Sequence, residues 1–339
     1  MVYLQAISYY HPEKCLTNED ISSLHPEWSA EKISNKTGIY NRHISADDET
    51  AVDMAEKAAN NLFEEYSIER NSIDMIILCT MSPDYFYPAS SCILQHRLGL
   101  LESCGAFDFN LGCSGFVYGL GIAKGLIATG QAKNVLLLTS ETFTKYLHPQ
   151  DKSCLTLFGD AAAASLITAE KHEEWLNAEI MSSAFRTIGA QYKDLILENG
   201  AARHPKTNDD FVEYNEDGSF KFSPNHAYMD GKAIFDFSAS VVPQVVEETL
   251  KNNGLLREDV DWYVFHQANM FLLNFTRIRC GVPTEKFIID LKDGGNTVSA
   301  TIPIALKHMM MDNRIKKGHK LLLCGFGVGL SVAGIVLKM

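Results

Sequence analysis

Cys113 lies where an apolar strand pattern gives way to a helical one. The run from Asp108 to Tyr118 places Gly112 and Gly115 on either side of this cysteine. Glycine lets the backbone turn sharply and lets another molecule approach closely. A helix that begins just after Cys113 would favour its thiolate through the helix dipole, and the thiolate is the nucleophilic form. Cys113 is therefore predicted to be a nucleophile, and a packed, unreactive thiol is the alternative.

Two polar residues further along the chain could act on the same substrate. His266 follows the apolar strand pattern at 262–265, so its imidazole is expected at a carboxyl end of the sheet, where ligand sites of open α/β sheets gather. Asn296 follows Gly294 and Gly295 and precedes a helical pattern. The alternatives are a structural histidine and an asparagine that caps a helix.

The same layout of elements occurs twice in the chain. A helical pattern and an aspartate precede a short apolar strand at position 74 and again at position 261, an offset of 187 residues. A second pair of strands begins at 135 and 321, an offset of 186. Two offsets that agree within one residue indicate an internal duplication. Shifted by 186, Cys113 falls on Ser299, so the cysteine elbow and the Asn296 turn are expected at equivalent places.

Each half alternates helical periods with short apolar strands, which predicts βαβ units with buried, mainly parallel sheets. The predicted halves are 1–175, with Cys113, and 176–339, with His266 and Asn296. Halves packed face to face would bring the three residues to one crevice. The polar, turn-rich stretch 198–225 reads as an insertion in the second half, either beside the site or as a disordered linker.

Composition narrows the class of protein. The 339 residues include 30 basic and 42 acidic ones, a formal net charge of −12, which disfavours a general nucleic-acid binder. The eight cysteines contain no CxxC pair, so no metal site or dithiol centre is indicated, and their apolar settings fit a reducing cytosol. No signal peptide is visible, and the glycine-broken run 321–337 reads as two strands around a turn, not a membrane span. We therefore expect a cytoplasmic enzyme.

Three segments in this order resemble the β-ketoacyl-acyl-carrier-protein synthase III family of the thiolase superfamily. They are Cys113-Ser-Gly-Phe116, His266-Gln-Ala-Asn269 and Gly295-Asn-Thr297. Supporting matches, which extend the resemblance over nearly the whole chain, are Lys36-Thr-Gly-Ile39, Phe158-Gly-Asp160 and Phe326-Gly-Val-Gly329. The resemblance implies a thiolase-like α/β fold, a duplicated five-layer αβαβα arrangement with two mixed, mainly parallel sheets.

The resemblance also implies an activity. Cys113 would take an acyl group from a thioester, and His266 and Asn296 would donate to the enolate formed when a malonyl unit on acyl carrier protein loses carbon dioxide. Backbone N–H groups of Cys113 and Val328 would form the oxyanion hole for acyl transfer. This acyltransferase would make a β-ketoacyl product, in fatty-acid initiation or a specialised pathway, without a cofactor. Loss of His266 or Asn296 should then impair decarboxylation far more than acylation.

Departures from the family pattern concern the substrate. Lys32 stands where the family often has a tryptophan for the adenine of coenzyme A, and Lys36 and Lys152 stand where it has arginines. Lysine keeps the charge for phosphate but lacks the planar stacking face. Phe271, two residues after Asn269, replaces an arginine that the family uses for carrier docking. The substrate-binding candidates are Lys36, Lys152, Tyr87, Asn269 and Phe271. They leave open whether the primer arrives as acyl-CoA or on a carrier protein.

A homodimer is also expected. Tyr87 resembles an aromatic residue that crosses into the partner's acyl pocket, with core packing as the alternative, and the strand at 135–138 resembles the family's interface edge. Two other functions remain open. One is acyl transfer from Cys113 to an oxygen, nitrogen or other carbon nucleophile, and the other is a non-catalytic partner subunit that binds acyl chains.

Overall fold

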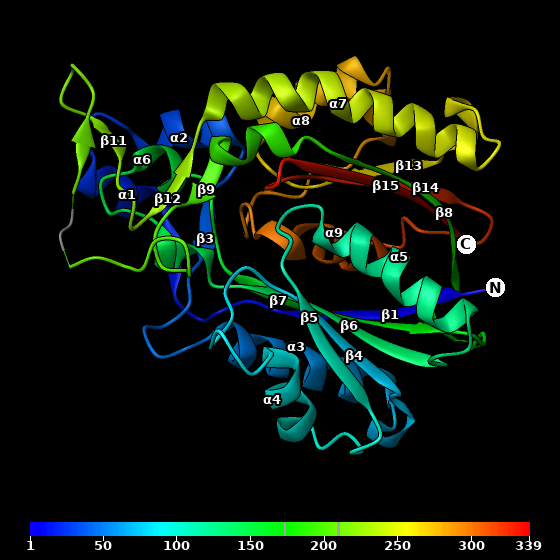
Figure 1. The fold of residues 1–339 in the computed structure, drawn as a ribbon. Helices are drawn as coiled ribbons and strands as arrows, with labels where there is room; N and C mark the ends of the chain where they lie inside the picture. The colour runs from blue at the N-terminus through cyan, green and yellow to red at the C-terminus, as the bar shows by residue number, and fades with distance from the viewer. Residues whose placement is uncertain (173, 209–210) are drawn as a thin grey trace.

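The protein is built in five layers (Figure 1), and the computed structural model describes residues 1–172, 174–208 and 211–339. Helices cover both outer faces, and further helices lie between the strands. The outer helices are α7 (Gly231–Asn252) and α8 (Met270–Arg279) on one face and α3 (Ala51–Tyr66) and α4 (Ser90–Arg97) on the other. The central helices are α5 (Gly115–Ala128) and α9 (Thr301–Met311). The expected αβαβα arrangement is confirmed.

The strands form one continuous hydrogen-bonded sheet that bends over in its middle. The order is β13-β14-β15-β8-β1-β7-β6-β4-β5. β8 and β1 are paired through two residue pairs only, at Tyr3 and Leu4, so the strands on either side form two separate layers. The strands, in sheet order, are β13 (Trp262–Phe265), β14 (Lys320–Gly327), β15 (Ser331–Lys338), β8 (Ala178–Thr187), β1 (Tyr3–Tyr10), β7 (Ala161–Thr168), β6 (Asn134–Glu141), β4 (Met75–Cys79) and β5 (Gly105–Phe109).

The two layers repeat the same pairing pattern. β4 pairs with β6 in parallel and β13 pairs with β14 in parallel, and in each layer two antiparallel pairings follow, β6-β7-β1 and β14-β15-β8. The sheets are mixed, as expected, but the expectation that they are mainly parallel was wrong, because β7 and β15 run antiparallel to their neighbours. Their apolar runs reflect burial on both faces, which an antiparallel strand between two helix layers also has. The division into halves 1–175 and 176–339 falls between β7 and β8 and remains a proposal.

The central helices pack between the two layers. Buried residues of α5, such as Phe116 and Leu120, and of α9, such as Ile302 and Leu306, belong to one apolar cluster with both sets of strands. A helix that is covered on all sides needs apolar residues around its circumference, which explains why neither segment has a clear polar face. Both helices begin at the same end of the molecule, so the segments before them are held on a rigid base.

Smaller elements gather at one end of the layers. They are α1 (Asn18–Leu24), α2 (Ala30–Thr37), α6 (Lys152–Leu155) and three two-stranded sheets, β2 (Cys15–Thr17) with β3 (Asn41–His43), β9 (Leu195–Leu197) with β12 (Ala227–Met229), and β10 (Glu213–Tyr214) with β11 (Phe220–Phe222). The described part of the insertion forms the β10–β11 hairpin. Phe220 stacks on His148 at 4.3 Å and Tyr214 donates to Gln150 at 3.0 Å, so this part packs beside α6 and is not a linker.

The apolar run 321–337 forms β14 and β15, as predicted. Across 1–172, 174–208 and 211–339, no helix is both long enough and apolar enough to cross a bilayer.

Candidate active site

Cys113 lies in the turn between β5 and α5, two residues before the helix begins. Its side chain is buried. The end of β14 presses against this turn, because a Cβ atom at Gly327 would lie 2.7 Å from the Cys113 Sγ and one at Gly325 would lie 2.7 Å from its carbonyl oxygen. Only glycine allows this approach at both positions, so the two glycines of β14 shape the surroundings of the thiol.

The environment of Cys113 favours the thiol over the thiolate. Burial raises the pKa of Cys113 to about 12, and the nearby Glu141 acts in the same direction. The backbone N–H groups of Val328 and Cys113 act in the opposite direction, because they donate toward the sulfur. The helix dipole and these N–H groups favour the thiolate, but desolvation outweighs them in the free protein. A base must remove the proton before this sulfur can attack a thioester.

His266 follows directly after β13, and its backbone N–H donates to the Cys324 carbonyl at 2.8 Å. The ring is buried and packs edge-on against Phe326. Burial lowers the pKa of His266 to about 3, so the ring is neutral at physiological pH. Its Nδ1 lies 2.8 Å from the Thr301 Oγ1, and the other ring nitrogen, Nε2, is therefore the one available to the site.

Asn296 is held by its backbone and its side chain. Its N–H donates to the Leu157 carbonyl at 2.9 Å, and its carbonyl accepts from the Gly159 N–H at 3.1 Å. The side-chain Oδ1 accepts from the Val298 N–H at 3.0 Å, which leaves the Nδ2 end as a donor. The N-cap of α9 is Ala300, so the alternative reading of Asn296 as the cap of this helix was wrong.

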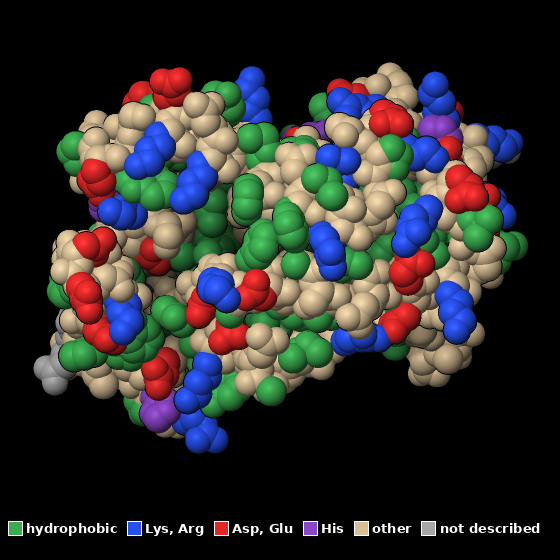
Figure 2. All heavy atoms as spheres, turned by 90° about the horizontal axis from the view of Figure 1, so that it is seen from above, with side chains coloured by type: hydrophobic (Ala, Val, Ile, Leu, Met, Phe, Trp, Pro, Cys, Tyr) green, Lys and Arg blue, Asp and Glu red, His purple; other side chains and the backbone are tan. Residues whose placement is uncertain are grey.

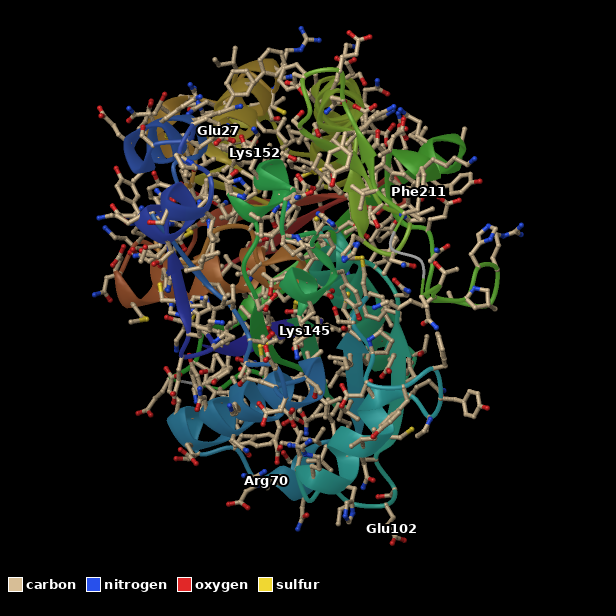
Figure 3. The ribbon with its side chains drawn as sticks, turned by 90° about the vertical axis from the view of Figure 1, so that its left-hand side faces the viewer. Glu27, Arg70, Glu102, Lys145, Lys152 and Phe211 are labelled. Atoms are coloured by element: carbon tan, nitrogen blue, oxygen red, sulfur yellow. The ribbon has the colours of Figure 1, made fainter. Side chains whose placement is uncertain are left out.

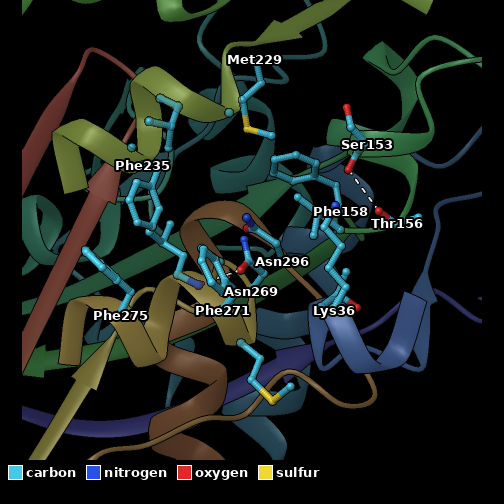
Figure 4. A pocket seen from close by; sticks show the side chains of 18 of the residues that line it. Lys36, Ser153, Thr156, Phe158, Met229, Phe235, Asn269, Phe271, Phe275 and Asn296 are labelled. Carbon is cyan, nitrogen blue, oxygen red and sulfur yellow. Dashed lines mark hydrogen bonds between the residues drawn. The ribbon is translucent and has the colours of Figure 1, made fainter. Parts of the chain in front are cut away.

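Cys113, His266 and Asn296 line one cavity of about 1050 Å³. Lys36, Asn269 and Phe271 line it too, together with Phe235 and Ile234 of α7, Phe275 and Ile278 of α8, and Met229, Leu195 and Phe158. Figure 4 shows the aromatic residues of α7 and α8 on one side, Lys36, Ser153 and Thr156 on the other, and the two asparagines between them. Figure 2 shows hydrophobic side chains gathered around a hollow in the face that carries α7.

Of the other predicted site residues, Asn269 and Phe271 line the cavity, whereas Lys152 and Tyr87 do not. Asn269 caps α8 by accepting from the Leu272 N–H at 2.9 Å. Lys152 is not among the described residues that line the cavity. Its Nζ forms an ion pair with the Glu27 carboxylate at 2.8 Å, and Figure 3 labels both residues. Tyr87 does not line it either and is 87% exposed, so core packing of Tyr87 was wrong. Phe271, at the cavity, is 63% exposed.

The predicted interface strand also needs a correction. The strand at 135–138 belongs to β6, which lies between β7 and β4 inside the sheet. The edge of the sheet on this side is β5, and its residues are all half-buried. Strand order depends on long-range pairing, which the apolar pattern of β6 does not reveal.

Sequence reasoning missed Trp28. This residue lines the cavity, and the Nζ atoms of Lys32 and Lys36 lie 5.1 and 4.8 Å from the centre of its ring. The available signal was its spacing, since Trp28 precedes Lys32 by four residues, about one helical turn. A tryptophan is therefore present near the position where Lys32 was taken to replace one.

Glu141 was also missed. The carboxylate is fully buried and accepts from the Met81 N–H, the Ser82 hydroxyl and the Ser299 hydroxyl at 3.1–3.2 Å. Burial raises its pKa to about 8 in spite of these donors. Glu141 thus connects Ser299, the residue equivalent to Cys113, with the strand β6 beneath the site.

Comparisons with known proteins agree with this geometry. Residues 107–189 match the family model described as 3-oxoacyl-[acyl-carrier-protein (ACP)] synthase III, and residues 250–339 match the model of its C-terminal part. The β-ketoacyl-[acyl-carrier-protein] synthase III of Methylococcus capsulatus is 37% identical over 330 residues, 97% of this chain and 96% of that protein. The corresponding protein of Clostridium perfringens is 34% identical, with 97% of each chain covered.

Solved structures show the same similarity. A crystal structure of a 3-oxoacyl-(acyl-carrier-protein) synthase III superposes with a TM-score of 0.95 at 44% identity, covering 100% of this chain and 99% of that one. The synthase III of Thermus thermophilus gives a TM-score of 0.85 at 30% identity, with 99% of each chain covered. With a thiolase-like fold and relatives matched over nearly their whole length, the chain belongs to the β-ketoacyl-[acyl-carrier-protein] synthase III family of condensing enzymes.

Proposed function

We propose that this protein joins an acyl group carried on Cys113 to a malonyl unit on acyl carrier protein, by decarboxylative Claisen condensation. The observation that supports this most is the meeting of Cys113, His266 and Asn296 on one cavity, with the Val328 N–H directed at the sulfur. A buried nucleophile, a neutral imidazole and an amide donor are the groups that the two half-reactions need. The chemistry uses acyl thioesters, water, and side chains and backbone N–H groups of this chain.

In the first half-reaction, His266 takes the proton from the Cys113 Sγ, which then attacks the thioester carbonyl. The oxyanion accepts from the N–H groups of Cys113 and Val328. Collapse of this intermediate forms the Cys113 thioester and releases the donor thiolate, which takes a proton from water. His266 keeps the proton that it took, because the negative charge of the entering malonyl carboxylate favours the protonated ring, which burial disfavours in the free enzyme. Oriented donors of this kind contribute most of the stabilisation in acyl transfer, about 2.7–4 kcal/mol for one donor.

In the second half-reaction, the bond between the malonyl carboxylate and its neighbouring carbon breaks and carbon dioxide leaves. The electron pair forms an enolate, whose oxygen accepts from the Asn296 Nδ2–H and the proton on the His266 Nε2. The enolate carbon attacks the acyl carbonyl, a carbon–carbon bond forms, and the bond to the Cys113 Sγ breaks. The sulfur regains its proton from His266, so both residues return to their starting states.

The acyl donor in this proposal is a phosphopantetheine thioester, on coenzyme A or on a carrier. Trp28 with Lys32 and Lys36 provides a flat ring and two positive charges beside the cavity, which suit a nucleotide with phosphates. Trp28→Ala should raise KM for acyl-CoA and leave KM for an acyl-carrier donor unchanged. Trp175→Ala, which removes a tryptophan stacked on His172 away from the cavity, is the matched control. Equal effects on both donors would contradict the nucleotide role.

A homodimer is part of the proposal. Tyr85, Phe86 and Tyr87 are 62%, 80% and 87% exposed, a run of aromatic residues that another surface would cover favourably. The nearby edge strand β5 has unpaired backbone groups that a second copy could pair. Light scattering should give twice the mass of one chain, and a monomer at micromolar concentration would contradict it.

A mixing experiment tests whether Tyr87 serves the partner's site. Cys113→Ala and Tyr87→Ala chains should each be weak alone. In a mixed dimer, the site with an intact Cys113 receives Tyr87 from the other chain, so activity should return to about half of wild type. No recovery in mixed dimers would show that Tyr87 acts within its own chain or not at all.

Acyl transfer to an oxygen, nitrogen or other carbon nucleophile is the competing function. A structural relative, the priming β-ketosynthase of the R1128 polyketide pathway, is 26% identical with a TM-score of 0.83 and shows that this fold also serves specialised pathways. A panel of acyl-CoA and acyl-carrier donors with malonyl-carrier decides between the two. Carbon dioxide released in step with β-ketoacyl product supports condensation, and acyl-enzyme that malonyl-carrier cannot discharge contradicts it.

We place the enzyme in the cytoplasm, because its eight cysteines are all free.

A further inference from the structure

Thr301, the first residue of α9, lies between His266 and the backbone of Val298. Its Oγ1 is 2.8 Å from the His266 Nδ1, and its hydroxyl donates to the Val298 carbonyl at 3.0 Å. The threonine is buried. The Val298 carbonyl also faces the His266 ring and favours its protonated form. The His266 Nδ1 therefore has a hydroxyl oxygen beside it, and a carbonyl oxygen faces the same ring.

The number of protons decides the orientation of these bonds. A carbonyl oxygen can only accept, so the contact of 3.0 Å requires the Thr301 proton to point at Val298. The hydroxyl has no second proton, so it accepts from the His266 Nδ1–H. A neutral imidazole carries one proton, and its position is fixed by the hydrogen bond of one nitrogen. The Nε2 of His266 is then an acceptor in the free enzyme.

We infer that Thr301 is a positioning residue that holds the proton of neutral His266 on Nδ1, and so keeps Nε2 free to take the thiol proton of Cys113. This inference rests on the proposed function, in which His266 first accepts that proton and then donates it to the enolate. With the opposite tautomer, Nε2 would carry a proton from the start and could not act as the base. Thr301 thus takes the part that a carboxylate has in a hydrolase triad.

The backbone of Val298 supports the same arrangement. Its φ is +54°, a left-handed conformation that a β-branched residue adopts only under strain, at a cost of about 1–3 kcal/mol. In this conformation the Val298 N–H donates to the Asn296 Oδ1, while its carbonyl accepts from Thr301. One strained residue therefore orients both polar groups of the proposed enolate site. Strain of this kind persists where the surrounding contacts fix it.

A second cavity beside Thr301 affects the choice of the substitution that tests its role. Thr301 also borders a polar cavity of about 290 Å³ lined by Tyr9, His11 and His308, which is large enough for water. In Thr301→Ala, a water molecule could enter from this side and replace the hydroxyl. Thr301→Val fills the same space without a hydroxyl and is the better test. Thr301→Ser restores the hydroxyl and is the matched control.

Ring-¹⁵N NMR of histidine in the full-length protein reads the tautomer directly, and His266→Gln assigns the His266 signals by difference. Wild type and Thr301→Ser should show a protonated Nδ1 and an unprotonated Nε2. Thr301→Val should lose this pattern, and acylation of Cys113 should slow on the order of 10²-fold, the lower part of the range for a general base. Thr301→Ser should acylate at close to the wild-type rate.

Two results would overturn the inference. One is a wild-type spectrum with the proton on Nε2, which does not depend on any variant folding. The other is a Thr301→Val protein with unchanged His266 signals and a wild-type rate of acylation. If His266→Gln also acylates at the wild-type rate, the role given to His266 in the proposed function fails as well, and the two failures are thereby distinguished.

Discussion

The turns before α5 and α9 occupy equivalent places in the two halves and have diverged in what they present to the cavity. The helices begin at Gly115 and Thr301, 186 residues apart, so Cys113 corresponds to Ser299. The two turns meet directly, since a Cβ atom at Gly112 would lie 3.3 Å from the side chain of Val298, its equivalent. The turn before α5 presents the Cys113 sulfur to the cavity. The turn before α9 buries the Ser299 hydroxyl, which donates to the Glu141 side chain.

The asparagines at equivalent positions differ in the same way. Asn110 is exposed, whereas Asn296 is buried and has its side-chain oxygen fixed by the strained Val298. In the proposed function, the turn before α5 carries the nucleophile, and the turn before α9 and the end of β13 carry the polar donors. Neither of the proposed halves would then have a complete site. Substitutions at matched positions should therefore have unequal effects.

Cys113→Ala should have the largest effect and reduce condensation to the uncatalysed rate. No other group can hold the acyl intermediate if the proposed function is right. Product formation from acyl-CoA and malonyl-carrier measures this. Cys154→Ala is the matched control, because Cys154 is also buried and packs in the same apolar cluster. Substantial activity in Cys113→Ala would show that the turn before α5 does not carry the nucleophile.

Substitutions in the second half should separate the half-reactions. Asn296→Ala should slow decarboxylation of the malonyl thioester by about 10²–10³-fold and leave acylation of Cys113 near its wild-type rate, because one enolate donor is lost. His266→Ala should slow both steps, since a thiol with a raised pKa needs a base. Labelled carbon dioxide release and acyl-enzyme formation measure the two steps. If acylation survives intact in His266→Ala, His266 is a donor only, as the sequence alone predicts.

Ser299→Ala should act on stability and not on acylation, although Ser299 is the equivalent of Cys113. The substitution removes one of the donors to the buried Glu141 carboxylate, which should cost about 1–3 kcal/mol in the free energy of unfolding. Denaturant unfolding measures the cost, with Ser219→Ala, whose hydroxyl donates to the exposed Asp217 carboxylate, as a control. A loss of acyl-enzyme comparable to that of Cys113→Ala would mean that the two positions have not diverged as described.

Glu141 should make stability depend on pH with a defined sign. Its pKa in the folded protein is about 8, above the value of about 4.3 in an unfolded chain. The folded state therefore binds the proton more tightly, and the free energy of unfolding falls as pH rises from about 4.3 to about 8. Glu141→Gln should remove this part of the slope. A difference between variant and wild type that is constant across this range would contradict it.

The sequence predicted the parts of this account that depend on local pattern. The elbow at Cys113, the turn at Asn296 and the 186-residue offset follow from glycines, apolar runs and spacing that the chain itself shows. These features predicted one shared cavity, and the family resemblance predicted the five layers.

Other features depend on contacts between distant segments. The raised pKa of Cys113 comes from burial and from Glu141, and β5 is the edge strand because β6 pairs on both sides. The place of Trp28 beside Lys32 and Lys36 depends on how the segment before α2 turns back. Local patterns carry little information on desolvation or strand order, so these features became visible only in the folded chain.

The central claim is that the first half holds the acyl group while the second half discharges it. Mapping the acyl group in Asn296→Ala tests this most directly. The variant is incubated with acyl-CoA and then with malonyl-carrier, digested, and analysed by peptide mass spectrometry, with wild type alongside. We predict one acyl group, on the peptide that contains Cys113, which persists in the variant and disappears from wild type. An acyl group on Cys104 or Cys154, or one that malonyl-carrier discharges equally in both proteins, would contradict the account.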